Sequence, residues 1–134
     1  MMQTIDHIGI AVRDLEQSME LYGRLFGVTT FHRERVEDQH VDIASFTVGT
    51  VRIELTAPTS PTSPIAVFLE KRGEGIHHVA VRTDDIPGEL HRLADDGVRL
   101  IDETPRPGAH NMMIAFLHPK STGGVLLELC SPKD

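Results

Sequence analysis

The chain has 134 residues, 40% of them hydrophobic and 25% charged, which suits one soluble globular domain with its own core. The net charge of −7, with acids and bases interspersed, argues against nucleic acid or an anionic membrane as main partner. A single cysteine, Cys130, excludes an intramolecular disulfide, and no signal peptide or membrane span is evident, so we expect a cytoplasmic protein.

The first half of the chain opens with a predicted strand over residues 4–12. An amphipathic helix follows, with Asp14 as its N-cap, Gln17 as the capping partner and Gly27 as its end. Three further strands are expected over residues 28–32, 40–48 and 50–56.

The middle of the chain is predicted to connect two similar halves. The prolines of residues 57–64 predict a linker without regular hydrogen bonding, and a short helix is expected over 65–71. The second half then repeats the plan, with a strand over 76–82 and a helix that Asp84 or Asp85 caps. Three last strands are expected over residues 98–102, 112–117 and 124–130.

Two pairs of segments repeat along the chain. Residues 51–58 match 125–132 and place Glu54 over Glu128, while residues 6–12 match 77–82 and place His7 over His78. The repeat predicts an α+β fold of two tandem βαβββ modules that form a curved sheet around a metal-binding cleft. We expect one domain over residues 1–134, with module one at 1–58, a linker and short helix at 59–75, and module two at 76–134.

Strand alternation places the four repeated residues together. His7, Glu54, His78 and Glu128 each lie on the strand face opposite the aliphatic residues, whereas His77 shares the aliphatic face. Two imidazoles and two carboxylates suit Co, Ni, Zn, Mn or Fe(II). A lone histidine or glutamate on a strand is more often a surface residue, and a decayed repeat without metal is the remaining alternative.

Four segments that together span nearly the whole chain form a recognisable pattern: residues 5–12, 63–66, 68–78 and 114–128, including Glu-Gly-Ile-His-His and His-Pro-Lys. In these segments the chain resembles the methylmalonyl-CoA epimerases of the vicinal oxygen chelate (glyoxalase) superfamily. It implies a homodimer that interconverts (2R)- and (2S)-methylmalonyl-CoA by removing and returning the α-proton through a metal-stabilised enolate.

The resemblance also implies roles for individual residues. His7, Glu54, His78 and Glu128 carry over as ligands of a divalent ion, Co²⁺ first and Mn²⁺, Ni²⁺ or Zn²⁺ next. Glu128 and Glu54 flank the α-carbon as the catalytic pair, with Glu54 acting as a structural ligand in the alternative interpretation. The acyl-CoA substrate could meet four basic residues, each of which is otherwise a solvated surface charge: Lys71, Arg72, Arg106 and Lys120.

The chain departs from the family pattern at two places. Members with Gln at the position of Glu54 tend to carry an extra glutamate on the preceding strand, as a proposed base. That glutamate falls here at Ile43, or at Asp42 with a slip of one residue, where His40 also replaces the family's Gly. The loop at residues 107–111, which contains His110, also lacks the family's usual second Gly.

Other functions of the same fold compete with the epimerase interpretation. A glyoxalase I-type lactoylglutathione lyase would use the same proton transfer beside a chelated carbonyl. An Fe(II) dioxygenase is less favoured, because a fourth protein ligand occupies a position that oxygen needs. A non-catalytic ligand-binding or resistance protein is the alternative outside enzymes, since fold alone does not fix function.

Overall fold

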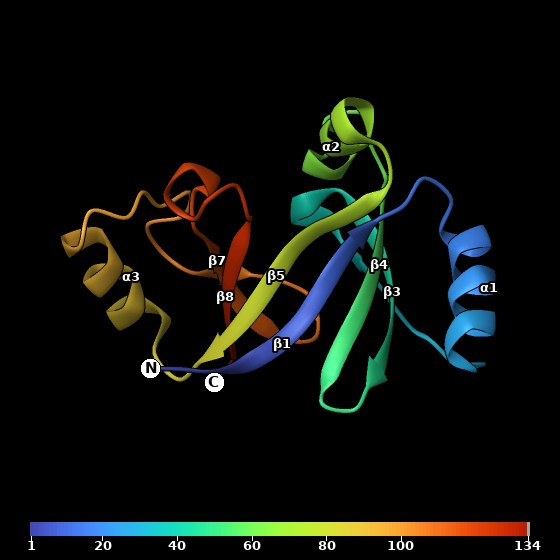
Figure 1. The fold of residues 1–134 in the computed structure, drawn as a ribbon, viewed down its shortest axis with the longest axis horizontal. Coiled ribbons are helices and arrows are strands. Elements are labelled where there is room, and N and C mark those ends of the chain that lie inside the picture. The colour runs from blue at the N-terminus through green and yellow to red at the C-terminus, as the bar shows by residue number, and fades with distance from the viewer. Residues whose placement is uncertain (134) are drawn as a thin grey trace. The chain divides into compact units, whose positions relative to one another are not determined.

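The computed structural model describes residues 1–133, which divide into two compact units. One, here called the split unit, consists of Met1–His7 and the chain from His78 onward. The other, the continuous unit, is Ile8–His77. Figure 1 labels most of the helices and strands of both. The elements in chain order are β1 Met2–Ala11, α1 Leu15–Phe26, β2 His32–Val36, β3 Val41–Val48, β4 Val51–Pro58, α2 Pro64–Arg72, β5 Gly75–Thr83, α3 Ile86–Asp95, β6 Arg106–Pro107, β7 Met112–Phe116 and β8 Leu127–Pro132.

The continuous unit is an antiparallel sheet with α1 packed on one face. Strands β2, β3 and β4 are neighbours in that order, and the amide of Val12, just after β1, donates to the carbonyl of Thr56 in β4. Helix α1 lies alongside β3 and β4, as Figure 1 shows. The hydrophobic core of this unit contains Leu15 of α1 with Ala44 and Leu55 of the sheet, so the aliphatic face of the sheet is the one that α1 covers.

The ends of α1 are as the sequence predicts. The Asp14 side chain accepts from the amide of Gln17 at 3.0 Å, and Gly27 takes the left-handed conformation with φ of 68°. Because the helix closes through Gly27 and the Val28 amide bonds back to Gly23, residues 28–31 are not available for a strand. The strand predicted over 28–32 is therefore wrong, and β2 begins only at His32.

The split unit is a mixed sheet with α3 packed on one face. Strands β5, β8, β7 and β6 are neighbours in that order, with β5 and β8 parallel and the other pairs antiparallel. Asp85, one of the two predicted caps, starts α3 by accepting from the Gly88 amide at 3.0 Å. Leu90 of α3 packs with Ala115 and Leu129, so these residues define the helix-covered face.

Two strands predicted in the second half of the chain differ in the structure. Residues 98–102 form only a bridge between Leu100 and Leu117, because the amides of Ile101 and Asp102 share the carbonyl of Phe116. Strand β8 starts at Leu127 rather than at residue 124, since Gly123 and Gly124 have positive φ and continue the turn.

Residues 57–64 were predicted to lack regular hydrogen bonding, but the first two of them, Ala57 and Pro58, belong to strand β4. Strand β4 continues through Pro58, which pairs with Val41 as the last residue of the strand, where a missing amide donor is tolerated. The short β6 was not predicted at all.

Strand alternation is confirmed within each unit. Leu129 packs under α3, whereas Cys130 packs on the other face with Ala80 and Phe116. Ile53 and Leu55 pack toward α1, which leaves Glu54 on the opposite face of β4. Among residues 1–133, no helix is both long and apolar enough to cross a membrane.

Candidate metal centre

Three of the four predicted ligands meet in the split unit. His7 comes from β1, His78 from β5 and Glu128 from β8. Ala80 is paired with Glu128 in the parallel ladder, and His78 lies two residues earlier on the same face of β5. His78 and Glu128 therefore lie on the same face of the sheet in this unit.

The donor atoms of these three residues are close together. The His7 Nε2 to His78 Nε2 distance is 3.2 Å, His7 Nε2 to Glu128 Oε2 is 3.4 Å, and His78 Nε2 to Glu128 Oε1 is 3.6 Å. The two imidazole rings are nearly perpendicular, at 88°, so both Nε2 atoms point toward one region.

Two of these three distances fall within the spacing expected around one divalent ion, and the third is slightly longer. Ligands about 2.1 Å from one ion are separated by about 3.0–3.4 Å in octahedral or tetrahedral geometry. The three residues are only 5%, 8% and 3% exposed, in the order His7, His78 and Glu128. Two imidazoles and a carboxylate buried this closely offer three donor atoms to one cation. Imidazole and carboxylate donors suit several first-row divalent metals.

The surroundings of His78 are apolar and aromatic. Its ring meets Phe116 edge-on at 5.8 Å between centroids, and Arg106 lies over the same Phe116 ring at 5.7 Å. Arg106 is in turn held by Asp102 at 3.1 Å. The Arg106 guanidinium, one of the four basic residues considered for CoA, is therefore anchored beside the site by an aromatic ring and a carboxylate.

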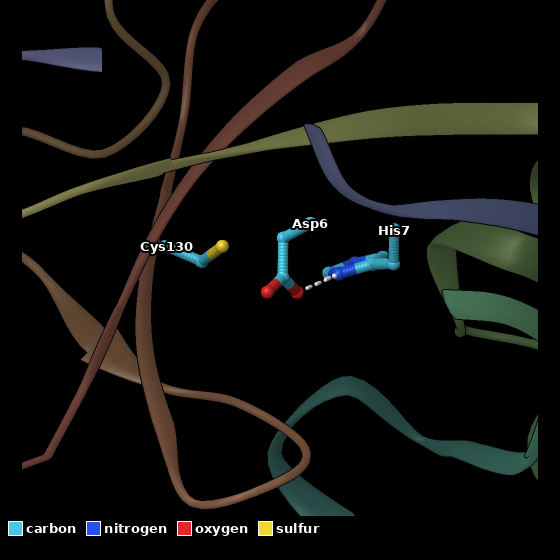
Figure 2. Close-up of side chains that lie close together, drawn as sticks. All are labelled: Asp6, His7 and Cys130. Carbon is cyan, nitrogen blue, oxygen red and sulfur yellow. Dashed lines mark hydrogen bonds and ion pairs between the residues drawn. The ribbon is translucent and has the colours of Figure 1, made fainter. Parts of the chain in front are cut away.

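Asp6 was not singled out by the sequence reasoning. Its Oδ2 lies 2.8 Å from Nδ1 of His7, and its side chain is 8% exposed. Figure 2 shows the Asp6 carboxylate directed at the His7 ring, with Cys130 on its other side. The sequence did place Asp6 directly before His7. However, strand alternation puts consecutive side chains on opposite faces, so the pattern gave no reason to expect a contact between these two side chains.

Glu54, the fourth predicted ligand, lies in the continuous unit. It is 3% exposed, on the β4 face away from α1, and Ser45 of β3 is its partner in the ladder. Arg52, two residues earlier on the same face, contacts Glu54 Oε2 through Nη2 at 2.9 Å and Nε at 3.0 Å. The Arg52 guanidinium therefore orients this carboxylate, a role that sequence reasoning missed.

The two positions expected for the additional glutamate of some family members are occupied here by a paired aspartate and an apolar residue. Asp42 forms a bidentate pair with Arg35 of β2, at 2.7 and 3.0 Å, and the hydrogen bond from Arg35 lowers the pKa of Asp42. Asp42 pairs with Ala57 in the β3–β4 ladder, so the Asp42 side chain lies on the face of the sheet opposite to Glu54. Ile43 is on the Glu54 side, buried and apolar.

His77 is a packed histidine, as its strand parity predicts. Its ring meets Phe68 of α2 edge-on at 5.1 Å between centroids. Burial lowers the pKa of His77 to about 4, so the imidazole is neutral at physiological pH. Lys71, Arg72 and Lys120, the other basic residues considered for CoA, are exposed.

Comparison with known proteins places this chain in a family. Residues 6–116 match the Glyoxalase/Bleomycin resistance protein/Dioxygenase superfamily. The chain is 39% identical to the mitochondrial methylmalonyl-CoA epimerase of Dictyostelium discoideum over 126 residues, covering 93% of this chain and 76% of that protein.

Solved structures show the same fold. Methylmalonyl-CoA epimerase from Mycobacterium tuberculosis has a TM-score of 0.93 and 42% identity, covering 99% of this chain and 90% of that one. A methylmalonyl-CoA epimerase in complex with methylmalonyl-CoA and NH4+ has a TM-score of 0.93 and 38% identity, with coverage of 98% and 96%. The α+β fold predicted from the repeat, and its vicinal oxygen chelate type implied by the resemblance, are thereby confirmed.

Proposed function

Because the chain belongs to the methylmalonyl-CoA epimerase family of the glyoxalase superfamily, we propose that it interconverts (2R)- and (2S)-methylmalonyl-CoA. The observation that carries this proposal is the buried cluster of His7, His78 and Glu128, with donor atoms 3.2–3.6 Å apart. Relatives that bear the same activity in their names cover nearly the whole chain, which supports an acyl-CoA substrate.

We propose that His7, His78, Glu128 and Glu54 hold one divalent ion, with Co²⁺ as first candidate. Glu54 is included because it is the repeat counterpart of Glu128, is buried, and lies on the strand face away from α1. When bound, such an ion would supply positive charge that stabilises the enolate formed as the α-proton leaves.

The proton transfers are assigned to the two glutamates. The α-carbon lies between a thioester and a carboxylate, which makes its C–H bond acidic. One carboxylate takes the proton from one face of that carbon, and the other delivers a proton to the opposite face, so the configuration inverts. Glu128 is the residue on which we expect turnover to depend most, with Glu54 as its partner.

Three further properties remain predictions. They are the single-domain organisation of residues 1–134, the homodimer and the cytoplasmic location. Each can be examined without substrate, by limited proteolysis, by sedimentation of the purified protein and by fractionation of cells, respectively.

Proton exchange tests the proposed reaction directly. The purified protein is loaded with Co²⁺, mixed with methylmalonyl-CoA in D2O, and the α-proton signal is followed by NMR beside a metal-free sample. We expect the signal to disappear only in the metal-loaded sample. Absence of exchange above the control would overturn the epimerase proposal, and the hemithioacetal of methylglyoxal and glutathione then tests the lyase alternative.

Asp42 is expected to be dispensable for this reaction. Its carboxylate is paired with Arg35 on the face away from Glu54, so Asp42→Asn should leave turnover within about twofold of wild type. Initial rates of epimerisation measure this, with Glu54→Gln as the matched carboxylate-to-amide change on the other face. A large loss of turnover in Asp42→Asn would instead make Asp42 a candidate base.

The Asp42→Asn variant should also differ from wild type in how its free energy of unfolding depends on pH. Arg35 holds the pKa of Asp42 below the ordinary 3.8, so the pair stabilises the folded state above that pH and loses its effect as the pH falls through the lower folded value. The stability difference between wild type and Asp42→Asn should therefore be constant near neutral pH and shrink below about pH 3.8 in urea unfolding.

A further inference from the structure

A buried carboxylate faces the side of His7 that is turned away from the proposed metal. The two ring nitrogens of His7 have different neighbours, because Nδ1 is 2.8 Å from Asp6 Oδ2 whereas Nε2 is near His78 and Glu128. An ionised carboxylate can only accept a hydrogen bond, so Nδ1 must carry the proton that this contact uses. A neutral His7 ring then has its lone pair on Nε2, where the proposed ion would bind.

The burial of Asp6 strengthens this interaction. Asp6 and His7 are 8% and 5% exposed, and Cys130 next to them is fully buried, so the carboxylate is largely shielded from water. A hydrogen bond to a charged acceptor is stronger in such surroundings than at the surface. Imidazole ligands of metals commonly donate their second N–H to a carboxylate, which fixes the ring and increases its basicity.

We propose that Asp6 is a positioning residue that fixes the His7 ring and its tautomer, so that Nε2 is preorganised to bind the divalent ion. The inference rests on the proposed function, because it requires His7 to be a ligand. Asp6 itself touches neither the substrate nor the ion. Its removal should weaken metal binding first, and turnover only as a consequence.

A different arrangement would use Asp6 as a ligand itself. Side-chain atoms of Asp6, His7 and Cys130 lie within 4.8 Å of one another and could together hold an ion. However, Nδ1 of His7 is already engaged by Asp6, and the Cys130 thiol is directed at the Val81 carbonyl at 3.7 Å. The positioning role is therefore favoured, and a thiolate-to-cobalt absorption band would reveal the alternative.

The test compares Asp6→Asn and Asp6→Ala with wild type. Co²⁺ affinity is measured by competition with a chelator, and the His7 tautomer is read from the ¹⁵N shifts of its ring in the metal-free protein. Asp95→Asn is the matched control, because Asp95 pairs with His91 at 3.4 Å on the exposed surface of α3. Thermal unfolding of each variant reports whether the fold is retained.

We expect Co²⁺ affinity to fall about 10-fold in Asp6→Asn and up to about 100-fold in Asp6→Ala, the range found for carboxylates that support metal-binding histidines. Asparagine can still accept from Nδ1 but lacks the charge, so its effect should be smaller. The His7 shifts should show an Nδ1–H ring in wild type and a mixture of tautomers in Asp6→Ala. Turnover of Asp6→Asn should recover at saturating Co²⁺.

The outcomes separate this inference from the proposed function. Unchanged Co²⁺ affinity in a folded Asp6→Ala protein, a wild-type His7 ring protonated on Nε2, or a thiolate-to-cobalt band that Cys130→Ser removes would each overturn the positioning role. A wild-type protein that binds Co²⁺ as predicted but does not exchange the α-proton would overturn the epimerase proposal alone. A wild-type protein that binds no divalent ion would overturn both.

Discussion

Replacing Glu128 with Gln is expected to lower epimerase turnover by at least about 100-fold, the lower end of what a positioned general base contributes. The substitution preserves shape and leaves an amide oxygen that can still act as a ligand, but it removes the ability to accept a proton. Because Glu128 is 3% exposed and lies within 3.6 Å of both histidines, no solvent-borne base replaces it easily.

The measurement pairs initial rates with bound cobalt on the same samples. Glu103→Gln is the matched control, since Glu103 is an exposed glutamate of the same unit. If the rate falls only in proportion to lost cobalt, Glu128 is a ligand without a role in proton transfer. A rate near wild type at full occupancy would exclude Glu128 from proton transfer.

The side-chain orientations that the sequence predicted are those fixed by strand periodicity. His7, His78 and Glu128 could each be assigned to the non-aliphatic face of their strand because side chains alternate along a strand and the adjoining residues are aliphatic. The internal repeat then associated Glu54 with Glu128, and capping signals located α1 and α3.

The strand misplaced at residues 98–102 depends on tertiary hydrogen bonds that the local sequence does not encode. Residues 98–102 have strand-like composition, but Ile101 and Asp102 both donate to Phe116, so no ladder forms. The parallel pairing that puts Ala80 beside Glu128 also has no local signal. The support that Asp6 gives to His7, and that Arg52 gives to Glu54, depends on side-chain rotamers rather than on residue pattern.

Glu54→Gln is expected to stop inversion at C-2 while leaving proton exchange from one face of the substrate. The reason is that inversion needs an acid and a base on opposite faces, whereas exchange with solvent needs only one of them. Arg52 contacts Glu54 Oε2 through two nitrogens, which orients this carboxylate in β4. Neither Asp42 nor Ile43 can replace it, because the first is paired with Arg35 and the second is apolar.

Each diastereomer of methylmalonyl-CoA is incubated separately in D2O with Co²⁺-loaded Glu54→Gln, and loss of the α-proton and inversion are followed in parallel. With Glu128 intact, the diastereomer whose α-proton faces Glu128 should exchange, while inversion of either diastereomer falls by at least about 100-fold. Equal losses of exchange and inversion from both diastereomers would instead make Glu54 a structural ligand. Inversion near the wild-type rate would show that the second acid–base group is another residue.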